Sequence, residues 1–163
     1  MSAVREDCER EASGTAFRLM TEDDLDAVMA IEIAVYPFPW TRGIFFDCIK
    51  TGYLCQILEL NGKLVAYAVM SSAVQESHLL TIVVASDEQG KGYGKQMLNK
   101  MIKMAVSDNA KTMYLEVRTS NKTAIQLYDQ RGFNELGIRN NYYPAEKGRE
   151  DALILGLDLS FEQ

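Results

Sequence analysis

Hydrophobic residues recur along the first third of the chain with the spacing of one strand and two helices. Apolar residues 16–20 predict the strand, and Thr21 follows as an N-cap for a helix whose apolar positions continue to Val35. Two prolines then break the pattern, and Thr41 caps a second helix that stops near Gly52.

The middle of the chain has the pattern of three strands. Residues 53–60 and 63–71 are separated by an Asn-Gly turn, so they predict a hairpin. Residues 78–85 are apolar at nearly every position, which is expected of a central strand that is buried on both faces.

The last third of the chain begins with an amphipathic helix. Apolar or small residues follow the i, i+3, i+4, i+7 spacing after Gly94. Residues 112–118 then alternate as a strand, and a short helix runs from the cap at Asn121 to Gln130. Two last strands are predicted at 133–138 and 152–159. The order βααβββαβαββ describes an α/β fold with a mixed sheet flanked by helices.

Length and composition indicate one globular domain. The chain has 163 residues, of which 47% are hydrophobic and 25% charged, as in ordinary globular proteins. We expect residues 1–15, which are polar and without periodicity, to form a flexible leader and residues 16–163 to form a single domain. No window approaches the ~18 apolar residues of a membrane span, and no secretion signal is recognisable. These features favour a cytoplasmic protein with no membrane partner.

Charge and the reactive side chains narrow the range of functions. The formal net charge of −6 argues against direct binding of nucleic acid and favours a basic substrate or protein partner. Three cysteines without a C-x-x-C pair suggest reduced thiols, and the only histidine, His78, cannot assemble a zinc cluster. We therefore expect no metal.

The segment Gln89-Gly90-Lys91-Gly92-Tyr93-Gly94 leads from the buried strand into the amphipathic helix. Glycines let the backbone adopt positive φ, and the N–H groups of a helix N-terminus attract phosphate. A glycine-rich turn without a ligand is the structural alternative. The spacing does not fit an ATP-type P-loop or a dinucleotide fingerprint.

This Q-x-x-G-x-G motif after an apolar strand resembles the acetyl-CoA motif of the GCN5-related N-acetyltransferase (GNAT) family. The resemblance extends over roughly residues 16–159, and within the family it is strongest to the bacterial ribosomal-protein-alanine N-acetyltransferases. The matching segments are Phe38-Pro39-Trp40, Leu115-Glu116-Val117-Arg118, Ser120-Asn121, Ala124-Ile125 with Leu127-Tyr128, Gly132-Phe133 and Arg139-Asn140-Asn141-Tyr142-Tyr143-Pro144. The resemblance implies the GNAT acyl-CoA N-acyltransferase fold, with acetyl-CoA as cosubstrate.

The resemblance also implies how the chain holds CoA. Backbone N–H groups from Gly90 to Lys95 would bind the pyrophosphate, and the pantetheine arm would pair with a strand backbone. Asn121 corresponds to the asparagine of the family that contacts CoA, although its side chain also suits a helix N-cap. The residues predicted to bind the cosubstrate are Ile82, Val83, Val84, Gln89, Gly90, Lys91, Gly92, Tyr93, Gly94, Lys95 and Asn121.

Two residues are predicted to carry the chemistry. Glu116 lies on the face of its strand opposite the apolar side chains and matches the catalytic glutamate of the relatives, so it is the candidate general base; a solvent-facing glutamate is the alternative. Tyr128 matches the proton-donating tyrosine and is the candidate general acid, with simple aromatic packing as its alternative. His78 is a weaker candidate base. The cysteines lack basic neighbours, so we expect direct transfer.

Aromatic residues on two loops are predicted to bind the acceptor. These are Tyr36, Phe38 and Trp40 among the prolines, and Tyr142 and Tyr143 near the C-terminus, with Glu76 as a further lining residue and Trp40 expected to be mostly packing. The resemblance implies that they hold a peptide N-terminus, most simply the N-terminal alanine of a basic ribosomal protein, by a chain expected to be a monomer. A lysine or small-amine acetyltransferase and a catalytically silent CoA-binding module remain the alternatives.

Overall fold

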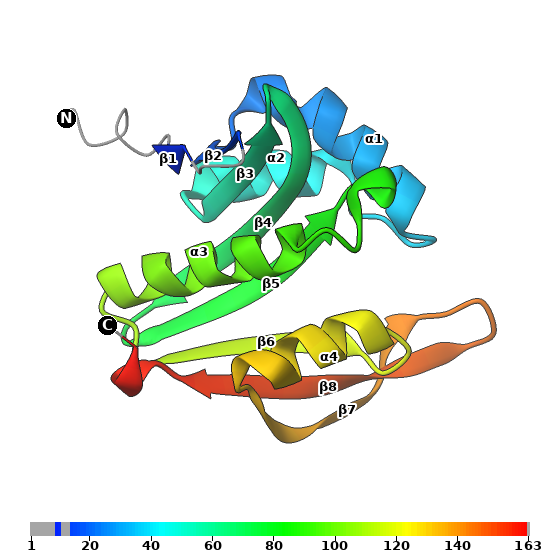
Figure 1. Cartoon of the computed structure of the whole chain (residues 1–163). Helices are drawn as coiled ribbons and strands as arrows, with labels where there is room; N and C mark the ends of the chain where they lie inside the picture. The colour runs from blue at the N-terminus through cyan, green and yellow to red at the C-terminus, as the bar shows by residue number, and fades with distance from the viewer. Residues whose placement is uncertain (1–8, 11–13, 163) are drawn as a thin grey trace. The chain divides into compact units, whose positions relative to one another are not determined.

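The computed structural model describes residues 9–10 and 14–162 (Figure 1). In chain order the strands and helices are β1 (Glu9–Arg10), β2 (Thr15–Leu19), α1 (Leu25–Val35), α2 (Arg42–Thr51), β3 (Leu54–Leu60), β4 (Lys63–Ala73), β5 (Glu76–Val84), α3 (Tyr93–Ser107), β6 (Thr112–Arg118), α4 (Lys122–Arg131), β7 (Asn134–Pro144) and β8 (Arg149–Asp158). Short 3-10 turns occur at Glu22–Asp24, Ser86–Glu88 and Leu159–Phe161. From β2 onward, the order of strands and longer helices is the predicted one.

The strands are hydrogen-bonded in the order β1-β2-β3-β4-β5-β6-β8-β7. Strands β5 and β6 are parallel, whereas β2–β3, β3–β4, β6–β8 and β7–β8 are antiparallel pairs. The sheet is therefore mixed, as predicted. The β5–β6 pairing runs from Glu76 opposite Thr112 to Leu79 opposite Leu115, so Glu116 directly follows the last pair.

The described residues form two compact units, one made of those up to residue 70 together with 81–98, and the other of 71–80 together with those from residue 99 onward. In the first unit, Leu25 and Val28 of α1 and Phe45 of α2 lie on the apolar faces of their helices and are completely buried. The caps predicted for α2 are present, because Thr41 accepts a hydrogen bond from the N–H of Ile44 and Gly52 adopts a left-handed conformation.

In the second unit, one face of β6 contributes side chains to the hydrophobic core. Met113, Leu115 and Val117 are buried, while the residues between them are half-buried, so the strand alternates as its sequence predicts. From β8, Leu155 and Leu157 are also buried. This alternation places Glu116 on the face opposite the buried residues of its own strand.

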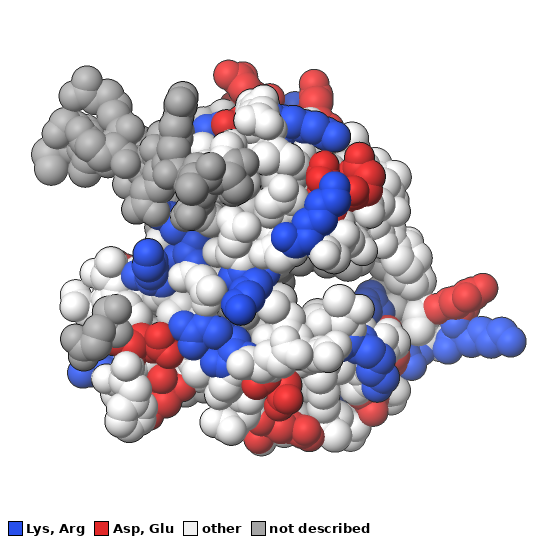
Figure 2. Space-filling view, in the orientation of Figure 1, with Lys and Arg blue, Asp and Glu red and all other residues white. Residues whose placement is uncertain are grey.

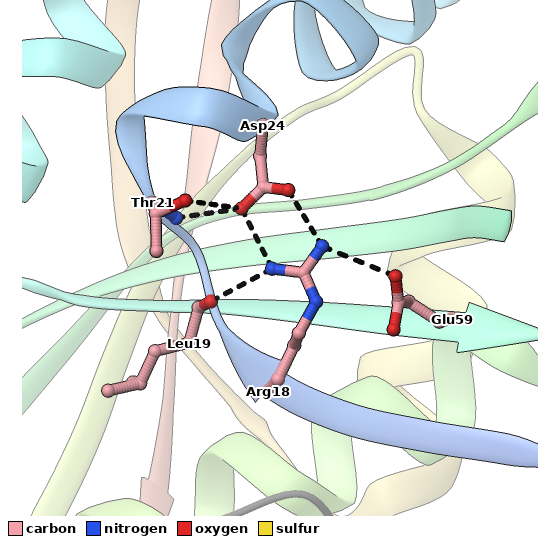
Figure 3. A network of polar contacts seen from close by, with 5 residues as sticks. All are labelled: Arg18, Leu19, Thr21, Asp24 and Glu59. Carbon is pink, nitrogen blue, oxygen red and sulfur yellow. Dashed lines mark hydrogen bonds and ion pairs between the residues drawn. The ribbon is translucent and has the colours of Figure 1, made fainter. Parts of the chain in front are cut away.

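A polar network fixes the start of the first helical region (Figure 3). Both guanidinium NH₂ groups of Arg18 donate to Asp24, at 2.8 and 2.7 Å, and one also contacts Glu59 at 3.2 Å. The carboxylate of Asp24 in turn accepts the backbone N–H of Thr21 at 2.7 Å. Burial alone would raise the pKa of Asp24, but the hydrogen bonds from Arg18 and Thr21 offset this and lower it.

The last two strands are longer than predicted. They were expected at 133–138 and 152–159, but β7 extends to Pro144 and β8 begins at Arg149, with a short turn between them. The extension is polar and almost wholly exposed, so it has no hydrophobic alternation from which a strand could be predicted.

Other features lie at or near the ends of the chain. Within the predicted leader, Glu9 and Arg10 pair with Phe17 and Ala16 of β2, and residues 1–8, including Cys8, and 11–13 lie outside the described residues. In the part of the chain that the structure describes, no helix combines the length and hydropathy that a membrane crossing requires. Acidic and basic side chains are interspersed on the face shown in Figure 2.

Candidate active site

The predicted phosphate loop joins the end of β5 to the start of α3. Gly90 and Gly92 have φ values of 78° and 89°, a region that side chains with a Cβ rarely adopt. A Cβ at either glycine would meet no atom within 4 Å. These glycines are therefore required by the backbone conformation, which also leaves room for a ligand to approach the loop.

Two side chains of this loop have partners within the protein. Gln89 donates from Nε2 to the carbonyl of Val84 at 3.1 Å, and the Lys91 ammonium bonds the buried Glu88 at 2.8 Å. The bond to Glu88 raises the pKa of Lys91, so the ammonium is a cation at neutral pH. Because Lys91 is already paired with a carboxylate, an anion at this loop would be held by backbone N–H groups rather than by this ammonium.

In the second unit, Glu116 is the centre of a polar cluster. Its side chain is only 11% exposed, and its two carboxylate oxygens have different neighbours. Oε1 lies 3.2 Å from Nε2 of His78, and Oε2 lies 3.1 Å from Nε of Arg139. Among the described residues, Oε2 has no aligned hydrogen-bond donor, because Arg139 is close to it but poorly directed.

Tyr142 connects this cluster to the predicted acceptor loop. Its hydroxyl is close enough to the Glu116 carboxylate for that carboxylate to affect its pKa, and its ring lies 5.4 Å from the guanidinium carbon of Arg139. Burial and the neighbouring Glu116 carboxylate raise the pKa of Tyr142, so its hydroxyl is a proton donor rather than a phenolate. The structure therefore brings together two predicted site residues, Glu116 and Tyr142.

Polar contacts fix the backbone of the β7–β8 hairpin. Arg149 donates to the carbonyls of Asn141 and Tyr142, each at 2.8 Å, and the Asn141 N–H donates to Asp151 at 2.9 Å. The Tyr142 and Tyr143 rings are 4.9 Å apart and nearly perpendicular, and the guanidinium carbon of Arg118 stacks 4.5 Å from the Tyr143 ring. The register shift between Arg139 and Tyr143 makes room for this bulged segment.

Tyr128 and Asn121 show the packing and capping that were the alternatives to their functional roles. Tyr128 is buried, with its ring 5.5 Å from that of Phe133. The side chain of Asn121 accepts the N–H of Ala124 at 3.2 Å, so it caps α4. Neither contact excludes the catalytic or CoA-binding role predicted for the same residue.

In the first unit, the aromatic loop after α1 is anchored by a buried carboxylate that the sequence analysis did not single out. Glu32 accepts the backbone N–H of Trp40 at 2.9 Å and the hydroxyl of Tyr67 at 2.6 Å. The Trp40 ring packs 5.2 Å from Phe45, as expected of a mostly structural residue, whereas Phe38 is exposed. The signal that was missed is a charged residue on the buried face of α1, in line with Leu25 and Val28.

The strand that was predicted to be buried on both faces is only partly so. In β5, Val83 is buried, Ile82 and Val84 are half-buried, and Glu76 is exposed at the start of the strand. Cys48 and Cys55 are free and buried, and burial raises the pKa of the Cys55 thiol to about 12. Such a thiol is a poor nucleophile at neutral pH. The described residues contain no cluster that could hold a metal ion.

Comparison with known proteins identifies the class of protein. A family model described as the Acetyltransferase (GNAT) family matches residues 25–133, which is more than half of the chain. The chain therefore belongs to the GNAT family of acetyltransferases. Acetyl-CoA, the predicted cosubstrate, is the acetyl donor that membership of this family entails.

Two relatives and one solved structure are similar over most of their length. The [ribosomal protein bS18]-alanine N-acetyltransferase of Escherichia coli K12 is 41% identical over 137 residues, which cover 84% of this chain and 93% of that protein. The protein of the same name from Salmonella typhimurium is 37% identical over 142 residues, which cover 87% and 96%.

The crystal structure of the ribosomal-protein-S18-alanine N-acetyltransferase from Escherichia coli matches with a TM-score of 0.85 and 38% identity, covering 91% of this chain and 96% of that one. This match confirms the predicted fold.

Proposed function

We propose that this chain transfers the acetyl group of acetyl-CoA to the α-amino group of a protein N-terminus, and that its acceptor is the N-terminal alanine of ribosomal protein bS18. One observation carries the proposal: the carboxylate of Glu116 is nearly buried beside Tyr142, with one oxygen that lacks an aligned donor. An amine can donate a hydrogen bond to such an oxygen. The names of the relatives in Escherichia coli and Salmonella typhimurium supply the acceptor.

The donor is held by the loop after β5. Backbone N–H groups from Gly90 to Lys95 bind the pyrophosphate, and Gln89 holds the loop against the end of β5. The pantetheine arm pairs with the backbone of Ile82, Val83 and Val84, and Asn121 contacts CoA while it caps α4.

The chemistry is direct attack of the amine on the thioester. Glu116 acts as general base and removes a proton from the attacking nitrogen, while Tyr128 acts as general acid and protonates the departing thiolate. A phenol serves as this acid because it is neutral and protonated at physiological pH.

Selectivity for an α-amine follows from acidity and from the acceptor loops. An α-amino group has a pKa of about 7.7–8.0, against about 10.4 for lysine, so far more of it is the free base near neutral pH. Tyr36, Phe38 and Trp40 on one loop and Tyr142 and Tyr143 on the other contact the first residues of the acceptor, with Glu76 at the margin. The net charge of −6 favours binding of a basic protein partner. We place this reaction in the cytoplasm and expect the enzyme to act as a monomer.

The test uses two peptides of one sequence, which begins with alanine and carries a single internal lysine. One peptide has a free N-terminus and the other is blocked by a formyl group. Release of CoA with the free peptide alone supports the proposal. Equal release with both peptides assigns the activity to lysine, and no release with either peptide indicates a silent CoA-binding module.

A further inference from the structure

His78 is the only histidine of the chain and lies beside the proposed base. It is the third residue of β5, opposite Tyr114 of the parallel strand β6, and its side chain is 41% exposed. Its Nε2 is 3.2 Å from Oε1 of Glu116. Imidazole is the side chain that exchanges protons most readily near neutral pH, so its contact with the proposed base bears on the fate of the amine proton.

The closeness of Nε2 to the carboxylate favours one ring nitrogen as the carrier of the hydrogen. A carboxylate oxygen only accepts hydrogen bonds, so a lone pair on Nε2 would face the lone pairs of Oε1. The Nε2–H tautomer avoids this repulsion and leaves the lone pair of the neutral ring on Nδ1. A carboxylate that fixes the tautomer of an imidazole in this way is the arrangement by which enzymes turn histidine into a general base.

Charged and polar side chains from β5 and β7 surround the pair. On β5 itself, Glu76 lies two residues before His78 and on the same face of the strand. Across the pair, Arg139 of β7 lies 3.1 Å from the second oxygen of Glu116, and Tyr142 lies beside the same carboxylate.

We propose that His78 and Glu116 act as one base, in which Glu116 holds the Nε2–H tautomer and Nδ1 of His78 receives the proton that the amine loses. This rests on the proposed function, and it assigns the base to the pair rather than to Glu116 alone. The amine nitrogen forms a bond to the acetyl carbon, and the carbon–sulfur bond breaks. The amine proton passes to Nδ1, and the thiolate takes a proton from Tyr128. The imidazolium then releases its proton to solvent, and the Tyr128 phenolate regains one from solvent.

The first arm of the test needs no activity. Because the chain has one histidine, ¹⁵N-histidine labelling of protein without a histidine tag gives one pair of ring signals. We expect the Nε2–H tautomer at pH 8, and in Glu116→Gln we expect the ring to titrate at a lower pH, since the anion that stabilises the imidazolium is gone. The Nδ1–H tautomer, or the same titration in both proteins, overturns the proposal.

The second arm measures kcat against pH for acetylation of the free-N-terminus peptide. His78→Gln keeps a side-chain donor for Glu116 but cannot titrate, so we expect kcat to fall about 100-fold with binding of acetyl-CoA unchanged. We also expect the acidic limb to change, because only the ionisation of the amine remains in it. Glu135→Gln, an exposed carboxylate on β7, is the control and should keep the wild-type profile. A His78→Gln enzyme within twofold of wild type and with an unchanged acidic limb overturns the proposal.

The two arms separate this inference from the function on which it rests. If the wild-type protein acetylates no N-terminal peptide, the proposed function fails, and the ring signals alone still decide whether Glu116 fixes the tautomer of His78. If the peptide is acetylated, both arms must give the expected result.

Discussion

Removing the hydroxyl of Tyr67 tests how the buried carboxylate of Glu32 supports the first unit. Tyr67 is completely buried and donates to Oε1 of Glu32 at 2.6 Å, and Glu32 itself is 2% exposed. Tyr67→Phe keeps the ring but leaves a buried carboxylate oxygen without this donor. Hydrogen bonds to charged groups contribute about 1.5–3 kcal/mol, and a buried group left unsatisfied costs a similar amount.

We therefore expect Tyr67→Phe to lower the free energy of unfolding by about 2 kcal/mol. For a chain of this size, this corresponds to a fall in Tm of about 4–8 °C. The measurement is chemical denaturation at pH 7, with thermal melting as a second probe. Tyr53→Phe makes the same chemical change at a tyrosine that is 38% exposed, so this control should stay within about 0.5 kcal/mol of wild type.

The same bond makes a prediction about alkaline pH. Burial and the bond to Glu32 raise the pKa of Tyr67 in the folded protein. A raised pKa means that stability is fully present below the unfolded value of about 10 and is lost as the pH rises above it. The stability gap between wild type and Tyr67→Phe should therefore narrow above about pH 10. A Tyr67→Phe protein that is as stable as Tyr53→Phe at pH 7 would refute the reasoning.

Four further predictions follow from single sites. Asp24→Asn should lower the free energy of unfolding by about 1–2 kcal/mol at pH 7. Because the pKa of Asp24 is lowered in the folded protein, chemical denaturation should show the difference from wild type closing as the pH falls below about 4. A difference that stays constant with pH contradicts the role of the network. Gly92→Ala should weaken the binding of acetyl-CoA about fivefold, because a side chain at a φ of 89° adds about 1 kcal/mol of backbone strain. Calorimetry measures this affinity, and an unchanged value contradicts the prediction. Glu116→Gln and Tyr128→Phe should each lower kcat about 100-fold with acetyl-CoA affinity retained, and normal rates in both would remove their assigned roles. Cys55 should resist a thiol reagent at pH 8 until the protein is denatured, because its pKa is about 12; rapid labelling of the native protein contradicts this.

Periodicity predicted those parts of the fold in which burial alternates along a single element. Strand β6 was predicted at 112–118, and the structure has it at Thr112–Arg118 with Met113 and Leu115 buried. The position of Glu116 on the other face follows from this alternation alone. Helix caps were predictable for the same local reason, as Thr41 and Asn121 show.

Features that depend on contacts between distant elements were not predictable from the residues. The polar half of β7 forms a strand because Arg149 and Asp151 of β8 bond its backbone, and no hydrophobic pattern records this. The environment of Glu116 likewise combines His78 from β5 with Arg139 from β7, which lie far apart in sequence. The sequence identified the candidate base, but only the folded chain reveals its neighbours.

Localisation of the acetyl group on the acceptor is the measurement that tests the central claim most directly. Purified, unmodified bS18 that begins with alanine is incubated with acetyl-CoA and this protein, and its intact mass and tandem mass spectra are then recorded. The account predicts the gain of a single acetyl group, on the α-nitrogen of the N-terminal alanine. Acetylation of a lysine side chain, or an unchanged mass while acetyl-CoA is consumed with other amines, would contradict it.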